Sequence, residues 1–228
     1  MLVTVRAELA DAGADELRAA GDRRAHDLIV AALAEVAPDD AILSEEATDD
    51  GDRLDHERVW IVDPLDGTRE FSEPPRTDWA VHVALAIEGT PVAGAVALAA
   101  LDLTLATDSP PPLPARAPGP PRLLVSRTRP PAEAAVLRDA LGGELVPMGS
   151  AGAKAMAVAR GEADIYAHSG GQYEWDSAAP VAVALAMGLH ATRLDGATLA
   201  YNRADPYLPD LLICRPEYAR PVLEALGA

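Results

Sequence analysis

Proline is concentrated in one short segment of this chain, and that segment limits how the remaining residues can fold. Seven of the fourteen residues from 108 to 121 (DSPPPLPARAPGPP) are proline. Proline fixes φ and has no amide hydrogen to donate, so the segment can continue neither a helix nor a central strand. We therefore expect a stiff, extended connector between an N-terminal α+β lobe, residues 1–107, and a C-terminal α/β lobe, residues 122–228.

Hydrophobic patterning predicts regular structure on both sides of the connector. Residues 20–36 repeat apolar positions on one face of a helix, whereas residues 59–62 are typical of a buried strand, which we expect to end at Pro64. Residues 79–106 indicate a hairpin or two adjacent strands. The C-terminal lobe alternates strands and helices, expected at 123–126, 130–141, 149–160, 163–167 and 178–187. Strands mixed with helices in this way indicate α/β layers.

The charge of the chain narrows the range of its partners. It carries 36 acidic and 19 basic residues, a formal net charge of −17, which repels polymeric nucleic acid and anionic membranes. No apolar stretch reaches the ~18 residues that a membrane span needs, and the first residues lack the apolar core of a signal peptide. The single cysteine, Cys214, excludes an internal disulfide, so we expect a cytoplasmic protein. A small phosphorylated ligand is compatible with this charge if cations line its site.

Two aspartates follow the predicted strand in the motif D-P-L-D-G-T. The carboxylates of Asp63 and Asp66 flank a tight turn, and the carbonyl of Leu65 is free to point between them. Three oxygens that converge in this way suit a hard divalent cation such as Mg²⁺. Gly67 would let the backbone approach a ligand and Thr68 adds a hydroxyl, so a phosphate could bind beside the cation. An aspartate-rich turn that only caps a helix would explain the motif equally well.

Further candidate residues lie far away in the sequence. Glu45 follows the apolar run 41–43, and Asp176 precedes the predicted helix at 178–187. Taken singly, Asp176 fits an ordinary first-turn acid of a helix, and Glu45 fits a solvated loop edge. Lys154 is the only lysine beside eighteen arginines. A lone lysine indicates a site where a compact ammonium group fits and a guanidinium group does not. Alternatively, Lys154 lies on a helix surface and has no special role.

Four segments, taken together, resemble one family. The chain resembles the Mg²⁺-dependent, lithium-sensitive inositol monophosphatase superfamily from about Gly21 to its end. The segments that carry the resemblance are, in order, S-E-E, W-I-V-D-P-L-D-G-T-R-E-F, G-S-A-G-A-K and E-W-D-S-A-A-P. Within this superfamily, the chain resembles the CysQ-type 3′(2′),5′-bisphosphate nucleotidases in the motifs D-G-T-R-E-F, V-S-R and E-W-D-S-A-A. These enzymes remove the 3′-phosphate of 3′-phosphoadenosine 5′-phosphate (PAP) in sulfate assimilation. The resemblance implies a layered α-β-α-β-α sandwich of two lobes, with the active site between them.

The resemblance also implies a role for each matched residue. The implied ligands of two magnesium ions are Glu45, Asp63, the carbonyl of Leu65, Asp66 and Asp176. The implied catalytic residues are Asp22, Glu45 and Thr68. The substrate-binding residues that we expect are Gly67, Thr68, Arg69, Arg127, Ser150, Lys154, Tyr173 and Asp176. Arg127 and Tyr173 are candidates for the second phosphate and the base of a nucleotide, although an exposed arginine and a core tyrosine would explain Arg127 and Tyr173 equally well. A third magnesium ion beside Asp22 stays open, because the threonine that precedes this acid in relatives is missing here.

The predicted function is Mg²⁺-dependent hydrolysis of a phosphate monoester, with the 3′-phosphate of PAP favoured. Such a reaction needs alignment and neutralisation of charge more than covalent help, which two metal ions can supply. Within the same class, an inositol monophosphatase or a fructose-1,6-bisphosphatase is the alternative. Outside it, the alternative is a non-catalytic phospholigand sensor on the same fold. We expect a small phosphorylated nucleotide as the partner, and because relatives include monomers and dimers, a homodimer stays open.

Overall fold

The computed structural model describes residues 1–228, and two five-stranded sheets form its framework. The first sheet has the strand order β1 (Ala41–Ser44), β2 (Arg58–Asp66), β3 (Ala80–Ile87), β4 (Thr90–Leu98) and β5 (Leu103–Ala106). The second has the order β7 (Glu144–Met148), β6 (Arg122–Ser126), β8 (Ile165–Tyr173), β10 (Tyr207–Cys214) and β9 (His190–Thr192). Each sheet contains both parallel and antiparallel pairs.

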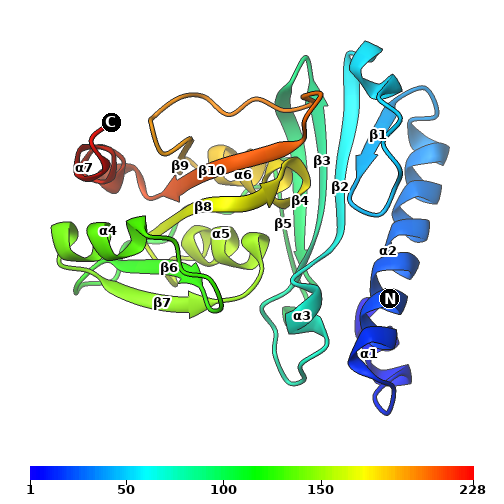
Figure 1. Cartoon of the computed structure of the whole chain (residues 1–228), viewed down its shortest axis with the longest axis horizontal. Helices are drawn as coiled ribbons and strands as arrows, with labels where there is room; N and C mark the ends of the chain where they lie inside the picture. The colour runs from blue at the N-terminus through cyan, green and yellow to red at the C-terminus, as the bar shows by residue number, and fades with distance from the viewer.

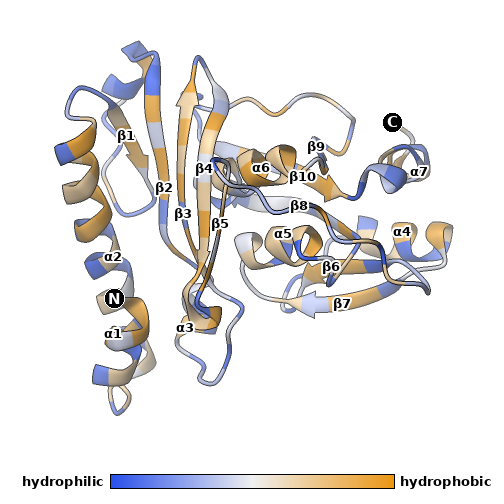
Figure 2. Ribbon diagram, turned by 180° about the vertical axis from the view of Figure 1, so that it is seen from behind, coloured by the Kyte–Doolittle hydropathy of each residue, from blue (hydrophilic) through white to orange (hydrophobic).

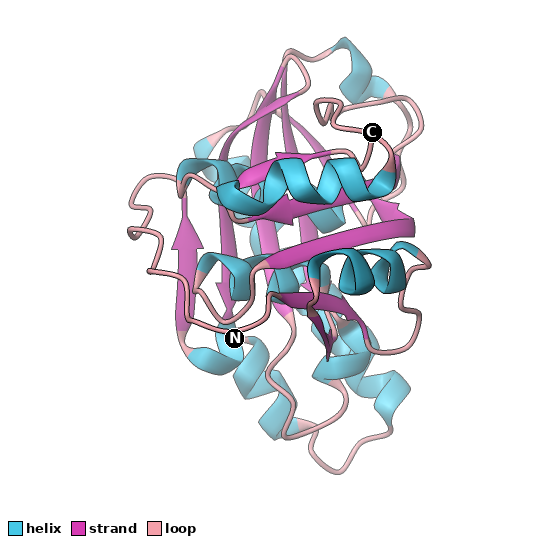
Figure 3. Cartoon of the chain, turned by 90° about the vertical axis from the view of Figure 1, so that its left-hand side faces the viewer, coloured by secondary structure: helices cyan, strands magenta, loops and turns pink.

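Helices flank and separate the two sheets (Figure 1). On the outer side of the first sheet, α2 (Ala14–Val36) packs on β2. Between the sheets, α5 (Ala151–Ala159) and α6 (Glu174–Ala186) contact strands of both. On the outer side of the second sheet, α4 (Glu133–Leu141) and α7 (Pro216–Leu226) pack together. The predicted α-β-α-β-α layering is therefore confirmed, and Figure 3 shows the strands of the two sheets running in crossing directions. None of the helices combines the length and the apolar character that a membrane span requires.

One large core joins the two sheets. It contains buried side chains from all strands of the first sheet, from β6, β8 and β10, and from α5 and α6; Figure 2 shows apolar residues along β2 to β4 and in both central helices. Small residues let α6 approach β4, because a Cβ added at Gly94 would lie 3.0 Å from the Cβ of Ala182. The first sheet thus buries its inner face against a helix that follows the proline-rich segment, and burial of this apolar surface favours the folded state.

A smaller apolar cluster lies between the N-terminal helices and the end of β2. It includes residues of α1 (Leu2–Glu8), α2 and the short α3 (Thr68–Phe71). Phe71 and Trp79 meet edge to face at 5.1 Å between ring centroids. Gly21 lets α2 come close, because an added Cβ would lie 2.8 Å from the Phe71 ring. This cluster therefore holds α2 against the residues that follow β2. Two 3₁₀ turns complete the helical elements, at Asp52–Asp55 and Ala99–Leu101.

Several predicted limits are wrong, and pairing between strands explains them. β2 does not end at Pro64 but continues to Asp66. Its register with β3 shifts between Asp63 and Asp66, and this irregularity accommodates Pro64, which has no amide hydrogen to donate. The predicted hairpin at 79–106 contains a third strand, β5. β8 extends to Tyr173 because β10, which the patterning did not predict, pairs along its length.

The proline-rich segment from 108 to 121 contains neither helix nor strand and connects β5 to β6. It is held against the C-terminal half of the chain. The carbonyl of Pro114 accepts a hydrogen bond of 3.0 Å from Arg215, and the guanidinium of Arg116 lies 5.4 Å from the centre of the Tyr218 ring. The first sheet is complete before this segment and the second begins after it. The division into two lobes at this point stays a prediction.

Candidate metal and phosphate site

Three aspartates from distant parts of the chain meet between the first sheet and α6. Asp63 and Asp66 lie at the end of β2, and Asp176 lies in the first turn of α6. One carboxylate oxygen of each lies within 4.8 Å of the other two. Carboxylate oxygens at this spacing suit Mg²⁺ or a similar hard divalent cation. The structure thus brings together three of the residues that the sequence nominated as metal ligands.

The irregular end of β2 sets the directions of the groups around the cluster. Asp63 Oδ1 accepts a hydrogen bond of 3.0 Å from the amide of Leu65, and Thr68 Oγ1 donates to the Leu65 carbonyl over 3.2 Å. Gly67 has a φ of +85°, which side-chain-bearing residues rarely adopt. A Cβ added there would also lie 2.9 Å from the Cβ of Ser150. Glycine therefore lets the D-P-L-D-G-T turn pack directly on the residues that begin α5.

The carboxylate of Asp66 binds the N-terminus of α5. Asp66 Oδ2 accepts hydrogen bonds from the Ser150 hydroxyl at 2.5 Å and the Gly152 amide at 2.6 Å, and Oδ1 accepts from the Ala151 amide at 3.1 Å. Ser150 also caps the helix, because its Oγ accepts from the Ala153 amide at 2.9 Å. Amides at a helix N-terminus stabilise a negative charge. Asp66 is therefore held ionised and in one orientation.

His82 is a buried partner of Asp66 that the sequence analysis missed. Its Nε2 lies 3.3 Å from Asp66 Oδ2, and its Nδ1 lies 3.0 Å from the carbonyl of Trp175. Burial lowers the pKa of His82, but the hydrogen bond and charge of Asp66 outweigh it and raise the pKa above its ordinary value. Nδ1 has a hydrogen-bond partner and Nε2 lies at ion-pair distance from a carboxylate, an arrangement that favours a protonated imidazole. The sequence offered only a weak signal, a polar residue inside an apolar strand.

The acids of the site repel one another. Burial raises the pKa of Asp63, and the charges of Asp66 and Glu45 raise it further. Burial and the charge of Asp66 raise the pKa of Asp176 to about 7. Burial acts to raise the pKa of Asp66 as well. The interaction with His82 is the main effect that outweighs burial, so the pKa of Asp66 is lowered to about 2. A divalent cation bound among these oxygens would relieve the repulsion, so the donor set fits a metal site.

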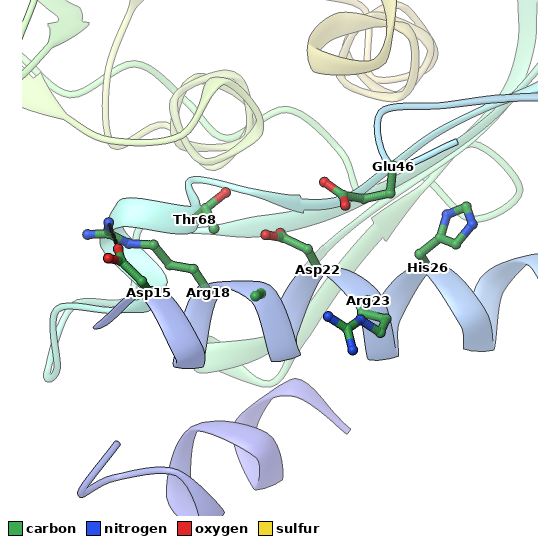
Figure 4. A pocket seen from close by; sticks show the side chains of 8 residues that line it. Asp15, Arg18, Asp22, Arg23, His26, Glu46 and Thr68 are labelled. Carbon is green, nitrogen blue, oxygen red and sulfur yellow. Dashed lines mark hydrogen bonds and ion pairs between the residues drawn. The ribbon is translucent and has the colours of Figure 1, made fainter. Parts of the chain in front are cut away.

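A cavity of about 520 Å³ opens between α2 and the turn after β2; we call it the α2 cavity. Figure 4 shows that Asp22, Glu46 and Thr68 point into this space. Burial and the charge of Glu46 raise the pKa of Asp22 to about 7. Burial likewise raises the pKa of Glu45 to about 7, although the neighbouring Asp63 acts in the opposite direction. Two of the predicted catalytic residues, Asp22 and Thr68, therefore line one cavity together with Glu46, whereas the third, Glu45, is not in its wall.

A second cavity of about 210 Å³ shares Thr68 with the first and has no hydrophobic residue in its wall; we call it the cationic cavity. The predicted substrate-binding residues that line it are Gly67, Thr68, Arg69, Arg127, Ser150 and Lys154. Tyr173 is not in its wall. It is 41% exposed, and its ring stacks on Trp175 with 4.8 Å between centroids. The structure thus brings six of these residues to one space and leaves Tyr173 outside it.

Two of the basic side chains in this wall already have partners. Arg127 lies with its Nε 2.5 Å from Glu70 Oε1 and its Nη2 2.8 Å from a Glu73 carboxylate oxygen. Lys154 is buried, and its Nζ donates to the carbonyl of Ser150 at 2.6 Å and to that of Gly149 at 3.3 Å. Both cations therefore hold protein groups in place rather than facing the cavity unpaired.

Comparison with known proteins agrees with this fold. A sequence profile of the inositol monophosphatase family matches residues 4–108 and 122–221, and the chain belongs to that family. Enzymes of the family are metal-dependent, and the aspartate cluster could bind a metal ion.

Individual relatives and solved structures extend the likeness over nearly the whole chain. The 3′-phosphoadenosine 5′-phosphate phosphatase of Mycobacterium tuberculosis is 53% identical over 235 residues, which cover 100% of this chain and 88% of the relative. Inositol monophosphatase II from Staphylococcus aureus superposes with a TM-score of 0.79 at 21% identity, covering 98% of this chain and 89% of the other. CysQ from Bacteroides thetaiotaomicron gives 0.73 at 28% identity, covering 85% and 83%.

Proposed function

We propose that this protein is a Mg²⁺-dependent phosphatase, a 3′(2′),5′-bisphosphate nucleotidase that converts PAP to AMP and phosphate in sulfate assimilation. The observation that carries the proposal is the meeting of Asp63, Asp66 and Asp176, with one oxygen of each within 4.8 Å of the others, beside a cavity lined by basic residues. The choice of substrate is supported by the 53% identity, over the full chain, to a mycobacterial PAP phosphatase.

The proposed ligands of two magnesium ions are Glu45, Asp63, the Leu65 carbonyl, Asp66 and Asp176, with Asp22 for a third ion. All of them offer hard oxygen atoms, and the Leu65 carbonyl keeps one lone pair beyond the hydrogen bond that it accepts from Thr68. When bound, magnesium supplies charge neutralisation at the phosphoryl group and lowers the pKa of water.

The side chains of the protein align the reactants for an in-line displacement. Thr68 Oγ1 donates to the Leu65 carbonyl, so its lone pairs stay available to accept a hydrogen bond from a water molecule in the α2 cavity. The Asp22 carboxylate faces the same cavity and would receive the proton that the attacking water releases. The Ser150 hydroxyl and the amides of α5 hold Asp66 still, which limits reorganisation during the reaction.

The test of this function is phosphate release from PAP in the presence of Mg²⁺ and after EDTA treatment. We expect release only with the metal, and we expect the Asp66→Asn and Asp176→Asn variants to lose at least about a hundredfold in kcat. Circular dichroism should show that Asp176→Asn keeps the fold, because an asparagine oxygen can still accept the hydrogen bond from the Tyr173 amide. Full activity in either variant would overturn the assignment of the site.

Two further measurements separate the alternatives. Values of kcat/KM for PAP, inositol 1-phosphate and fructose 1,6-bisphosphate should rank PAP first; a higher value for either sugar phosphate would change the substrate but keep the reaction class. A phospholigand sensor on the same fold would bind PAP without releasing phosphate under any metal condition. The presence of both Asp22 and Thr68 in the α2 cavity favours an enzyme.

A further inference from the structure

The cationic cavity collects positive charge against the trend of the whole chain. Four of its eleven wall residues are basic, namely Arg69, Arg127, Arg129 and Lys154, whereas Glu70 is its only acid. The chain as a whole has 36 acidic and 19 basic residues. A local excess of basic groups in an acidic protein raises the concentration of anions at that place. The ligand that fits this cavity is therefore an anion.

The pairing of these four side chains shows which of them are available to a ligand. Arg127 is bound to Glu70 and Glu73, and Lys154 is bound to two backbone carbonyls. The guanidinium groups of Arg69 and Arg129 make no hydrogen bond and no ion pair within the protein, and both side chains are exposed at the cavity wall. A guanidinium without a protein partner can bind both oxygens of a phosphate edge.

The loop after β6 brings Arg129 into the wall of the cavity and toward β8. The backbone amide of Arg129 donates a hydrogen bond of 3.2 Å to Ser126 Oγ. The Nη1 atom of Arg129 lies 3.9 Å from the position that a Cβ at Gly171, on β8, would occupy. Burial lowers the pKa of His168, also on β8, to about 4, and the charges of Lys154 and Arg129 lower it as well. His168 therefore lies in a positive field to which Arg129 contributes.

The position of Thr68 relates this cavity to the direction of the reaction. Thr68 lines both cavities, and the α2 cavity also contains Asp22 and Glu46, the acids suited to an attacking water. In-line displacement places the water and the leaving oxygen on opposite sides of the phosphorus. If the water attacks from the α2 cavity, the departing alcohol leaves on the opposite side of the phosphorus. The cationic cavity, which shares Thr68 with the α2 cavity, is the adjoining space that can receive it.

We propose that Arg129, together with Arg69, binds a second phosphate of the substrate, one that belongs to the leaving alcohol and is not hydrolysed. The ligand class is a nucleoside bisphosphate, and the inference rests on the proposed function. It moves this role away from Arg127, which the sequence analysis nominated, because the Arg127 guanidinium is taken up by two glutamates. Arg129 thereby becomes a residue that selects bisphosphates over monophosphates.

The test compares PAP with adenosine 3′-phosphate, the same nucleotide without the 5′-phosphate, in wild-type protein and in R129Q and R69Q. We expect R129Q to lower kcat/KM for PAP by about ten- to a hundredfold, mainly through KM, and to leave kcat/KM for adenosine 3′-phosphate within about twofold of wild type. R69Q should show the same selective loss to a smaller or equal degree. Arg220→Gln on α7, whose side chain is 87% exposed, is the control for charge and should change neither value.

Equilibrium titration of the same nucleotides with Ca²⁺ in place of Mg²⁺ provides a readout that does not require turnover. Weaker binding of PAP by R129Q, with unchanged binding of adenosine 3′-phosphate, supports the inference. Equal loss for both nucleotides, or no loss for either, overturns it, since Arg129 would then contact the scissile phosphate or no phosphate at all. Wild-type protein that binds PAP selectively through Arg129 but releases no phosphate would refute the proposed function, and only the binding of the second phosphate by Arg129 would then stand.

Discussion

At the scale of single residues, the site depends on how closely its groups approach one another. Gly152, the second residue of α5, lies where the imidazole of His82 reaches Asp66, and a Cβ added there would lie 1.9 Å from His82 Nε2. We expect Gly152→Ala to displace His82, lower the free energy of unfolding by about 1–3 kcal/mol and reduce phosphate release. Gly13→Ala is the matched control, because nothing lies within 4 Å of its added methyl. Equal urea midpoints for the two variants would contradict this account.

Lys154 provides a second prediction at this scale. Its Nζ holds the carbonyls of Gly149 and Ser150, so we propose that it positions Ser150, and through Ser150 the carboxylate of Asp66, rather than binding substrate. Lys154→Met keeps the length and packing of the side chain and removes the donors. We expect kcat for PAP to fall about tenfold or more while KM changes little.

Lys154→Arg separates the two interpretations further. A planar guanidinium cannot replace a buried ammonium between two carbonyls, so we expect no rescue of kcat. A raised KM with unchanged kcat in Lys154→Met, or full activity in Lys154→Arg, would instead indicate that the charge at this position contacts the substrate.

At the scale of elements, charged pairs fasten segments that the sequence keeps apart. Arg127, which follows β6, clamps Glu70 of α3 and the neighbouring Glu73. The Glu70 side chain is only 8% exposed, whereas that of Glu73 is 42% exposed. We expect Arg127→Gln to lower the free energy of unfolding by about 1–3 kcal/mol, because a buried carboxylate loses its partner. Glu73→Gln, which removes the exposed partner, should change it by less than about 0.5 kcal/mol.

Kinetics of the same variants check the role that the sequence first suggested for Arg127. Because its guanidinium is occupied by the two glutamates, KM for PAP should stay close to the wild-type value in Arg127→Gln. A large rise in KM without loss of stability would indicate that Arg127, as first suggested, binds the second phosphate.

The edge strand β9 is fastened in a similar way, and its attachment depends on pH. Asp210 on β10 accepts hydrogen bonds from Arg193 at 2.6 and 2.8 Å and from the Leu194 amide at 2.7 Å. Burial acts to raise the pKa of Asp210, but these partners outweigh it and the pKa is lowered below 3.8. The stability that Asp210 contributes is therefore complete above its unfolded-state pKa and is lost as pH falls through the lower folded-state value.

Asp210→Asn tests this dependence. We expect the variant to be less stable than wild type by about 1–3 kcal/mol at pH 7, with the difference closing as the pH falls through and below the ordinary carboxyl range. Urea unfolding at neutral pH and at pH values below 4 would measure it. Glu224→Gln is the control, since Glu224 and its partner Arg220 are both largely exposed. A difference that stays constant down to the lowest pH would argue against the ion pair.

At the scale of the whole molecule, the aspartate cluster joins residues from the two halves of the chain. Asp63 and Asp66 come from the first sheet and Asp176 from α6, so their oxygens meet only in the folded protein. A ligand that binds only the folded state stabilises it by mass action. We expect Mg²⁺ at ten times its Kd to add about 1.4 kcal/mol to the free energy of unfolding. Thermal unfolding with and without EDTA measures this, and Asp176→Asn should show a smaller shift. An unchanged melting temperature in wild type would contradict the site.

The parts of this protein that were predictable from sequence are those decided by neighbours along the chain. Apolar periodicity indicated α2, β6 and the central helices, because a repeat of 3.6 or 2 residues needs only local geometry. The end of β2 was misjudged, since the pairing with β3 decides whether Pro64 interrupts a strand. β10 and β9 escaped prediction for the same reason. The order of the motifs indicated the family and the acids of the site. The match to the family profile confirmed the prediction of the family.

The sequence by itself determined the acidic composition, the D-P-L-D-G-T turn, the proline-rich connector and the supply of carboxylates, because each is a property of residues close together in the chain. Only the tertiary structure decided which charges are free. It paired Arg127 with Glu70, turned Lys154 toward carbonyls, brought His82 against Asp66 and left Arg129 without a partner. The physical reason is that the strength of a charge depends on its burial and its nearest partners, and residues distant in sequence provide both.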